Sequence, residues 1–273
     1  MPVLLAASLR ETELFTRLQE LANERRCPLA LPGNVLDICN DAAARLKLFP
    51  AVHTQFTLHD ETHCLRVVQL MASVASGGVR RLNGVELALL ILAAYHHDQG
   101  MIVDASELDA IRSSTEWTTH EQDWAADYPN YREAAERSHD ASVTSAERDR
   151  AARVADDLRA AMWTDFIRRS HGKRSARFVS DKYRTDPRLN INSRSIADLL
   201  AVICESHVHP PETITTSNGY AFDELVGTDQ VNVALLAYIL RLADILDFDR
   251  ERTPASLISG HQFHERYQRH RVA

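Results

Sequence analysis

The sequence predicts an all-α protein, because apolar residues recur at helical spacings of three and four positions through most of the chain. Two segments, Leu87–Tyr95 and Val231–Phe248, are apolar almost all round, as expected for helices buried on every face. With 273 residues the chain can bury a sizeable core. One domain with appendages is therefore favoured over two domains.

Composition argues against several classes of protein. The formal net charge is −7 and the pI is about 6.0, which disfavours general electrostatic binding of nucleic acid but leaves a local basic groove open. The four cysteines show no zinc-like spacing, so we expect reduced thiols. The chain has no apolar run of membrane-spanning length, and its N-terminus lacks a basic signal-peptide region. We therefore expect a cytoplasmic protein.

Two helices are expected in the first 50 residues. Residues 9–26 read as one amphipathic helix, and residues 35–49 as a second. A break that contains proline and glycine, residues 27–34, separates them. We expect both helices to pack against the core.

The most informative segment is Tyr-His-His-Asp-Gln-Gly at positions 95–100, which ends the first apolar helix. Taking imidazoles and a carboxylate out of water costs several kcal/mol unless each is paired. A cluster of such groups in one turn therefore indicates a metal site. The alternative is a helix that surfaces here, with Gly100 as its C-cap and the histidines at the negative end of its dipole.

A histidine also falls on the core face of an earlier helix, which Thr57 or Asp60 can cap. The apolar stripe of this helix, which is identified by its residues below, leads to His63 when it is extended by one turn toward the N-terminus. Arg66 lies three residues on and can partner it. A core histidine that bonds a backbone carbonyl is the alternative. The stripe consists of Val67, Leu70 and Val74.

Between about residues 104 and 160 the sequence turns polar and charged, which indicates a helical insertion over one face of the core. This insertion is either a lid or a solvated surface excursion. His120 and His139 lack apolar periodicity and are expected at the surface. Residues 212–230 are expected to form a loop, with a short hairpin around residues 217–219.

Two later apolar helical faces end in histidine. The first begins at Trp163 and leads to His171, and the second begins at Ile196 and leads to His207. His209 is an alternative to His207 as a metal ligand, but it lies in the proline-rich segment after the helix rather than on the apolar face of the helix.

The last apolar helix carries a carboxylate, Asp244. In apolar surroundings this group needs a metal ion or an ion pair to remain ionised. An ion pair with Arg241 is the alternative to a metal.

Taken in order, these motifs resemble the HD-domain superfamily of metal-dependent phosphohydrolases. The family pattern is a histidine followed by Arg-Val, a His-Asp pair that ends an apolar helix, and a distant aspartate. THCLRVV, LAAYHHDQGM and RLADILDF match it, with His96 as an off-register neighbour of the pair. Gln99 replaces the usual apolar residue, and Met101 stands where many members have lysine. The subtype resembles the HD-CE variety, which is often joined to GHKL-type ATPase modules.

The resemblance spans about residues 57–254 and implies an all-α HD-domain bundle. It divides the chain into an N-terminal helical extension at 1–50, an HD domain at 51–254 that contains the insertion, and a polar tail or truncated connection at 255–273.

The resemblance also implies the site. Asp98 would be the catalytic residue, shared between one or two divalent ions chosen from Mn, Fe, Co, Ni, Zn and Mg. Arg66, Lys173 and Arg174 would hold a substrate phosphate. Solvation remains the alternative for Lys173 and Arg174, and orientation of a metal-bound carboxylate for Arg66. The implied metal ligands are His63, His97, Asp98, His171, His207 and Asp244.

The first functional hypothesis is therefore a phosphohydrolase that cleaves a phosphoester or phosphoanhydride of a nucleotide with a metal-activated water. A metal-dependent nuclease is the main rival within the enzymes. A nucleotide-sensing or scaffold module of a multidomain conflict or signalling protein is the non-catalytic alternative. A GHKL-type ATPase partner and an oligomer are further expectations.

Overall fold

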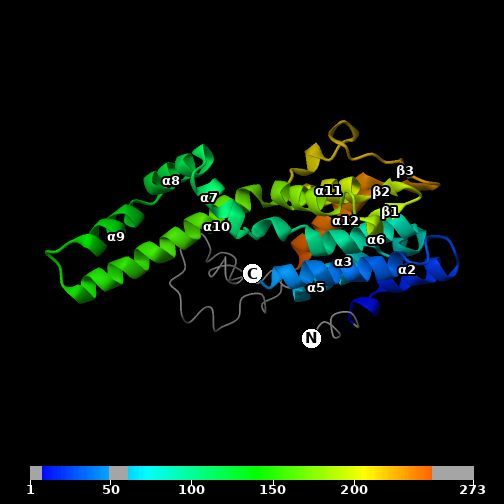
Figure 1. Cartoon of the computed structure of the whole chain (residues 1–273), viewed down its shortest axis with the longest axis horizontal. Coiled ribbons are helices and arrows are strands. Elements are labelled where there is room, and N and C mark those ends of the chain that lie inside the picture. The colour runs from blue at the N-terminus through cyan, green and yellow to red at the C-terminus, as the bar shows by residue number, and fades with distance from the viewer. Residues whose placement is uncertain (1–7, 49–60, 248–273) are drawn as a thin grey trace. The chain divides into compact units, whose positions relative to one another are not determined.

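The computed structural model of the chain describes residues 8–48 and 61–247 (Figure 1). The prediction of an all-α protein is confirmed, because helices dominate these residues and their strands form only two-stranded antiparallel sheets. The described chain divides into two compact units. Residues 8–48, 61–102 and 171–247 form the first, and residues 103–170 form the second.

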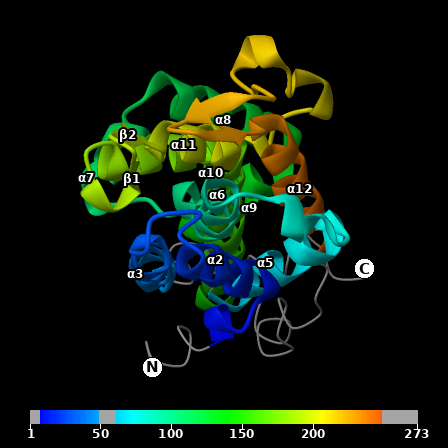
Figure 2. The ribbon, with the colours of Figure 1, turned by 90° about the vertical axis from the view of Figure 1, so that its right-hand side faces the viewer.

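The first unit is built around one helix, α6 (Gly84–His96), in which every residue is buried. Figure 2 shows α6 at the centre, with the other helices of this unit around it. Burial on all sides explains why its sequence reserves no face for water. The surrounding helices are α2 (Glu13–Asn23), α3 (Leu31–Leu46), α5 (Glu61–Ala75), α11 (Ala197–Ser206) and α12 (Val233–Leu246).

Helices α6 and α12 begin at the same place. Asn83 and Glu86 form a capping box at the start of α6, and the second carboxylate oxygen of Glu86 accepts from the backbone N–H of Asn232 at 3.0 Å. Asn232 is in turn the N-cap of α12. Because the two helices have 13 and 14 residues, they also end at the same level. His97 and Asp244 are thereby brought together.

The N-terminal helices differ from expectation at their starts. Thr12 caps α2 by accepting from the Phe15 N–H at 3.3 Å, so the expected single helix is interrupted before Glu13. Helix α3 begins at Leu31 rather than at residue 35. Pro32 lies in its first turn, where the absent N–H costs no hydrogen bond.

The second unit contains α7 (Ala105–Arg112), α8 (Thr115–Asp127), α9 (Pro129–His139) and the first part of α10 (Ser145–Tyr183). Figure 1 shows α8 and α9 alongside this part of α10. Trp124 packs on Ala161 and Met162 in a small core of its own, with Trp117, Tyr128 and Tyr131 around it.

The expected surface position of His120 is wrong. Its side chain is buried, and its Nε2 lies 3.2 Å from the carbonyl oxygen of Met162. Trp117 and Trp124 lie three and four residues away, so His120 shares their helical face. His139 is exposed, as expected.

The short hairpins link helices of the first unit. The strands Asn190–Ile191 (β1) and Arg194–Ser195 (β2) pair, as do Glu224–Val226 (β3) and Asp229–Val231 (β4). The second hairpin turns at Gly227, with φ +63°. The hairpin expected around 217–219 is wrong, since that segment is a 3₁₀ turn that ends at Gly219.

The predicted domain boundaries at residues 50 and 254 stay predictions, and the predicted tail at 255–273 lies outside the described residues. Among the described helices, none combines the length and the apolar character needed to cross a membrane.

Candidate metal centre

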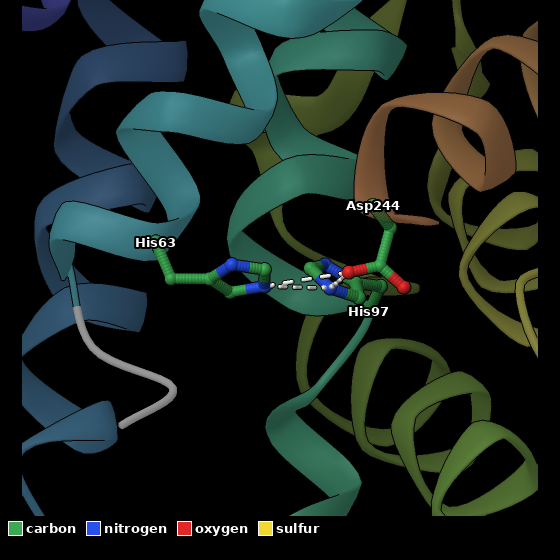
Figure 3. A group of neighbouring side chains, drawn as sticks. All are labelled: His63, His97 and Asp244. Atoms are coloured by element: carbon green, nitrogen blue, oxygen red, sulfur yellow. Dashed lines mark hydrogen bonds and ion pairs between the residues drawn. The ribbon is translucent and has the colours of Figure 1, made fainter. Parts of the chain in front are cut away.

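Three side chains from three different helices meet at one end of the first unit. His63 comes from α5, His97 directly follows α6 and Asp244 lies on α12, and their side chains point toward one another (Figure 3). The Nε2 atoms of His63 and His97 lie 3.3 Å apart. Each of them lies 3.6 Å from Oδ1 of Asp244. These three residues form the first ligand group.

A second ligand group lies beside the first and consists of Asp98, His171 and His207. The Nε2 atoms of the two histidines are 2.8 Å apart. His171 is on α10 and His207 is the C-cap of α11, so this group depends on the close packing of those helices.

Asp98 joins the two groups, because each of its carboxylate oxygens faces a different one. Oδ2 lies 3.3 Å from Nε2 of His97 and 3.7 Å from Nε2 of His63. Oδ1 lies 3.3 Å from Nε2 of His171 and 3.6 Å from Nε2 of His207. A carboxylate placed in this way can bridge two cations.

Two glycines allow the helices that carry these ligands to approach. A Cβ on Gly100 would lie 2.1 Å from the carbonyl oxygen of His171 and 2.5 Å from the Ser175 N atom. A Cβ on Gly172 would lie 2.4 Å from a methyl group of Val208. The turn after Asp98 and helix α11 therefore contact the α10 backbone in a way that a larger residue would prevent.

Three histidines of the centre present Nε2 because their Nδ1 atoms have other partners. Nδ1 of His97 lies 3.0 Å from the carbonyl oxygen of Ala94, and Nδ1 of His207 lies 2.5 Å from that of Cys204. Nδ1 of His63 lies 2.6 Å from Oδ2 of Asp247. Each Nδ1–H can donate there, which leaves Nε2 as the ring atom that faces the centre.

The charges of the centre favour a cation. Burial lowers the pKa of His97, but the carboxylates of Asp98 and Asp244 outweigh burial and raise it well above its ordinary value. Burial raises the pKa of Asp244, yet His97 outweighs it and holds that pKa below its ordinary value. Burial lowers the pKa of His207, which favours the neutral, ligating form.

The alternative partners weighed from the sequence are engaged elsewhere. Arg241 donates from Nη1 to the carbonyls of Ser206 and His207 at 2.7 and 2.9 Å, at the end of α11. Nε2 of His209 lies 3.3 Å from a carboxylate oxygen of Glu205, outside both ligand groups.

His96 and Gln99 also lie outside the ligand groups. Nδ1 of His96 contacts the Leu92 carbonyl oxygen at 2.8 Å, and burial lowers the pKa of this histidine to about 4. The amide of Gln99 donates to the carbonyls of Ala42 and Tyr95, both at 3.0 Å. Gln99 thus connects the turn after Asp98 to α3.

The three expected substrate-binding cations have different surroundings. Arg66 donates from Nε to Oδ1 of Asp247 at 3.0 Å. Arg174 donates to the carbonyls of Gly100 and Ile102 at 2.8 and 3.0 Å, and so supports the turn after Asp98. Lys173 is exposed on α10. Their assignment to substrate binding stays a prediction.

Sequence reasoning missed two residues that support the centre. Ser175 donates from Oγ to the carbonyl of His97 and accepts from the Gly100 N–H at 2.8 Å. Asp247 accepts from both His63 and Arg66. The spacing of Asp247, three residues after Asp244 at the end of an apolar helix, was a signal that could have identified it.

The residues fit divalent ions. Ligand atoms bonded to one ion at about 2.0–2.2 Å lie roughly 3 to 4 Å apart, and the distances within both groups are of this size. Neutral His207 also presents a lone pair toward Nε2 of His171, an arrangement that is repulsive without a cation or a proton between the two atoms. Imidazole with carboxylate suits Mn, Fe, Co, Ni and Zn.

Comparison with known proteins assigns the family. No curated protein and no solved structure matches the chain significantly. The model of the HD-CE family matches residues 53–270, which is most of the chain. Both ligand groups lie within the matched segment. The chain therefore belongs to the HD-CE family, whose domain here carries a His/Asp centre able to bind metal.

Proposed function

We propose that the chain is a metal-dependent phosphohydrolase with a two-ion centre, and that its substrate is a phosphoester or phosphoanhydride of a nucleotide. The observation that carries the proposal is the position of Asp98, whose two oxygens face two separate histidine pairs. A protein that held only one structural ion would not need a second ligand group around the opposite oxygen.

The ligand residues would hold two ions, one in each ligand group. His63, His97, Asp244 and Oδ2 of Asp98 would hold one of them, and His171, His207 and Oδ1 of Asp98 the other. Bound divalent ions supply charge that stabilises the phosphoryl oxygens and lower the pKa of water from ~15.7 to about 7. Asp98 sets the spacing of the two groups.

Burial indicates where substrate would approach. The side chains of His63 and His97 are 1% and 0% exposed, whereas that of Asp244 is 25% exposed. The α12 side of the centre is therefore its most accessible part among the described residues. Water is kept from the opposite side, which strengthens the attraction between cations and a phosphate.

The nucleotide assignment rests on the family and on general chemistry. A dense cationic centre suits a phosphoryl group, whose negative charge spreads over its oxygens during transfer. Phosphomonoesters, nucleoside triphosphates, cyclic nucleotides and nucleic acid offer the same electrophile. The association with a GHKL-type ATPase stays a prediction.

The test is metal content and phosphate release from the same preparations. We expect about two ions per wild-type chain and release of phosphate from members of a nucleotide panel with Mn²⁺ added. Asp98→Asn should lose at least one ion and about 10²-fold or more of the activity, because the bridging charge is removed. Asp198→Asn is the matched control, since Asp198 is 65% exposed and pairs with Arg184 on the surface.

The remaining outcomes separate the rivals. Cleavage of single-stranded DNA or RNA without release from free nucleotides would make the chain a nuclease. Nucleotide binding with two ions bound and no turnover would make it a sensor. A wild-type chain that takes up no metal would overturn the proposal.

A further inference from the structure

Asp247 is a buried carboxylate that touches two positively polarised groups and lies outside both ligand groups. Its side chain is 3% exposed. Oδ2 lies 2.6 Å from Nδ1 of His63, and Oδ1 accepts from Nε of Arg66 at 3.0 Å. A buried carboxylate is costly unless it is paired, and these two contacts supply a partner for each of its oxygens.

The contacts of Asp247 join α5 and α12, two of the three helices that position ligands of the first group. On α5, Arg66 follows His63 by three residues, and at the end of α12 Asp247 follows Asp244 by three. Each helix therefore supplies one ligand and one supporting residue a turn further on. The junction between α5 and α12 is closed by charge-assisted hydrogen bonds at the level of the centre.

The short contact determines which nitrogen of His63 faces the centre. With a carboxylate oxygen at 2.6 Å as its acceptor, Nδ1 can donate its proton there, which leaves Nε2 as the atom directed toward the centre. A carboxylate acceptor also makes an imidazole a stronger ligand than a carbonyl acceptor does. Nδ1 of His97 and of His207 contact backbone carbonyls instead. Among these three histidines, His63 alone has a carboxylate behind it.

We propose that Asp247, held by Arg66, is a positioning residue that orients His63 and selectively strengthens metal binding by the first ligand group. The inference rests on the metal centre of the proposed function, but it does not depend on which phosphate compound is cleaved. It also assigns Arg66 a role in supporting Asp247 rather than in contacting substrate.

The experiment is metal titration of the 273-residue chain. Co²⁺ binding is followed by its visible absorption, and Mn²⁺ binding by competition against a chelator. Asp247→Asn keeps one acceptor for His63 but removes the charge and faces Arg66 with an amide group. Asp247→Ala removes both acceptors. We expect the dissociation constant of the first-group ion to rise about 10- to 100-fold in Asp247→Ala, and less in Asp247→Asn. The second-group ion should change less than about threefold.

The absorption bands of cobalt at the first group should shift in both variants, because the orientation of the imidazole changes. Arg66→Ala should weaken the same ion, and Arg66→Lys should restore part of the loss, since a lysine amine can still pair with Asp247. Asp198→Asn, at an exposed ion pair, is the matched control and should leave both constants unchanged.

Thermal unfolding of the metal-free variants separates positioning from a purely structural role. If Asp247 only stabilised the fold, metal-free Asp247→Asn would unfold at a lower temperature while the metal constants of its folded form matched wild type, and the inference would be overturned. If the dissociation constants of both ions rose equally, the proposed selectivity for the first ligand group would be overturned. If Asp247→Ala does not fold, the same comparison is made with Asp247→Asn.

The proposed function and this inference fail in different ways. If the Asp247 variants bind only the first-group ion more weakly, and the wild-type chain releases no phosphate, the role of Asp247 is supported and the hydrolase is contradicted. Phosphate release with unaltered metal constants in Asp247→Asn would do the reverse. A wild-type chain that binds no metal would overturn both.

Discussion

The Nε2 atoms of His171 and His207 lie 2.8 Å apart, although the residues are 36 positions apart and belong to different helices. The Oδ1 atom of Asp98 faces both of them. Because the first ligand group uses neither histidine, the two groups can be tested separately.

Removing one histidine of the second group should remove one ion. We expect His207→Ala to reduce the metal content from about two ions to about one per chain, because only His171 and one oxygen of Asp98 remain. Metal analysis after dialysis measures this. His209→Ala is the control, since its ring contacts Glu205 and Tyr220 instead. Retention of two tightly bound ions in His207→Ala would remove that residue from the ligand set.

Adding one methyl group at Gly100 should push α10 away from the turn that follows Asp98. In Gly100→Ala the new Cβ would meet backbone atoms of His171 and Ser175, which cannot move aside without shifting α10. We expect a loss of about 3 kcal/mol or more in the free energy of unfolding, together with weaker metal binding. Urea unfolding measures the first effect and metal titration the second.

Gly33→Ala is the matched control for this substitution. No atom lies within 4 Å of a Cβ placed on Gly33, which is in helix α3. Alanine there should be neutral or stabilise the protein by up to about 1 kcal/mol. Equal stability of the two variants would show that Gly100 is not constrained.

The departure from the family pattern at Gln99 should matter for stability and not for metal binding. Gln99→Leu removes two hydrogen bonds, to the carbonyls of Ala42 and Tyr95. It also removes an acceptor of Arg45 at 3.2 Å. We expect a cost of about 1–3 kcal/mol in urea unfolding, with unchanged metal content. Gln19→Leu, on the exposed face of α2, should change neither quantity. Loss of metal from Gln99→Leu would contradict this prediction.

Asp186 should contribute to the free energy of unfolding at neutral pH, and this contribution should be lost in acid. Hydrogen bonds from Arg188 hold the pKa of this carboxyl below its ordinary value. The unfolded chain therefore binds the proton first, so the contribution is present above the unfolded pKa of about 3.9 and is lost as the pH falls through the lower, folded pKa.

Urea unfolding at several pH values tests this contribution. Asp186→Asn should be about 1–2 kcal/mol less stable than wild type at pH 7, and the difference should shrink as the pH is lowered below about 4. Asp181→Asn is the control, because Asp181 is 71% exposed and pairs only loosely with Arg177 at 3.4 Å. A difference that stayed constant down to pH 2.5 would exclude a charge effect at Asp186.

The sequence by itself determined the helical fold and the candidate ligands of the centre. Both follow from local physics: apolar residues at helical spacing mark the buried faces, and a histidine or aspartate at the end of such a face is costly unless it is paired. His63, His97 and Asp244 could be named on this basis, and the resemblance to a known family ordered them.

Only the tertiary structure decided how these residues are grouped. The shared start of α6 and α12, through Glu86 and Asn232, brings His97 and Asp244 to one level. The orientation of Asp98 between two histidine pairs and the contact of Asp247 with His63 depend on atoms far apart in the chain. Helical periodicity records which face of a helix is buried, but not which other helix covers it.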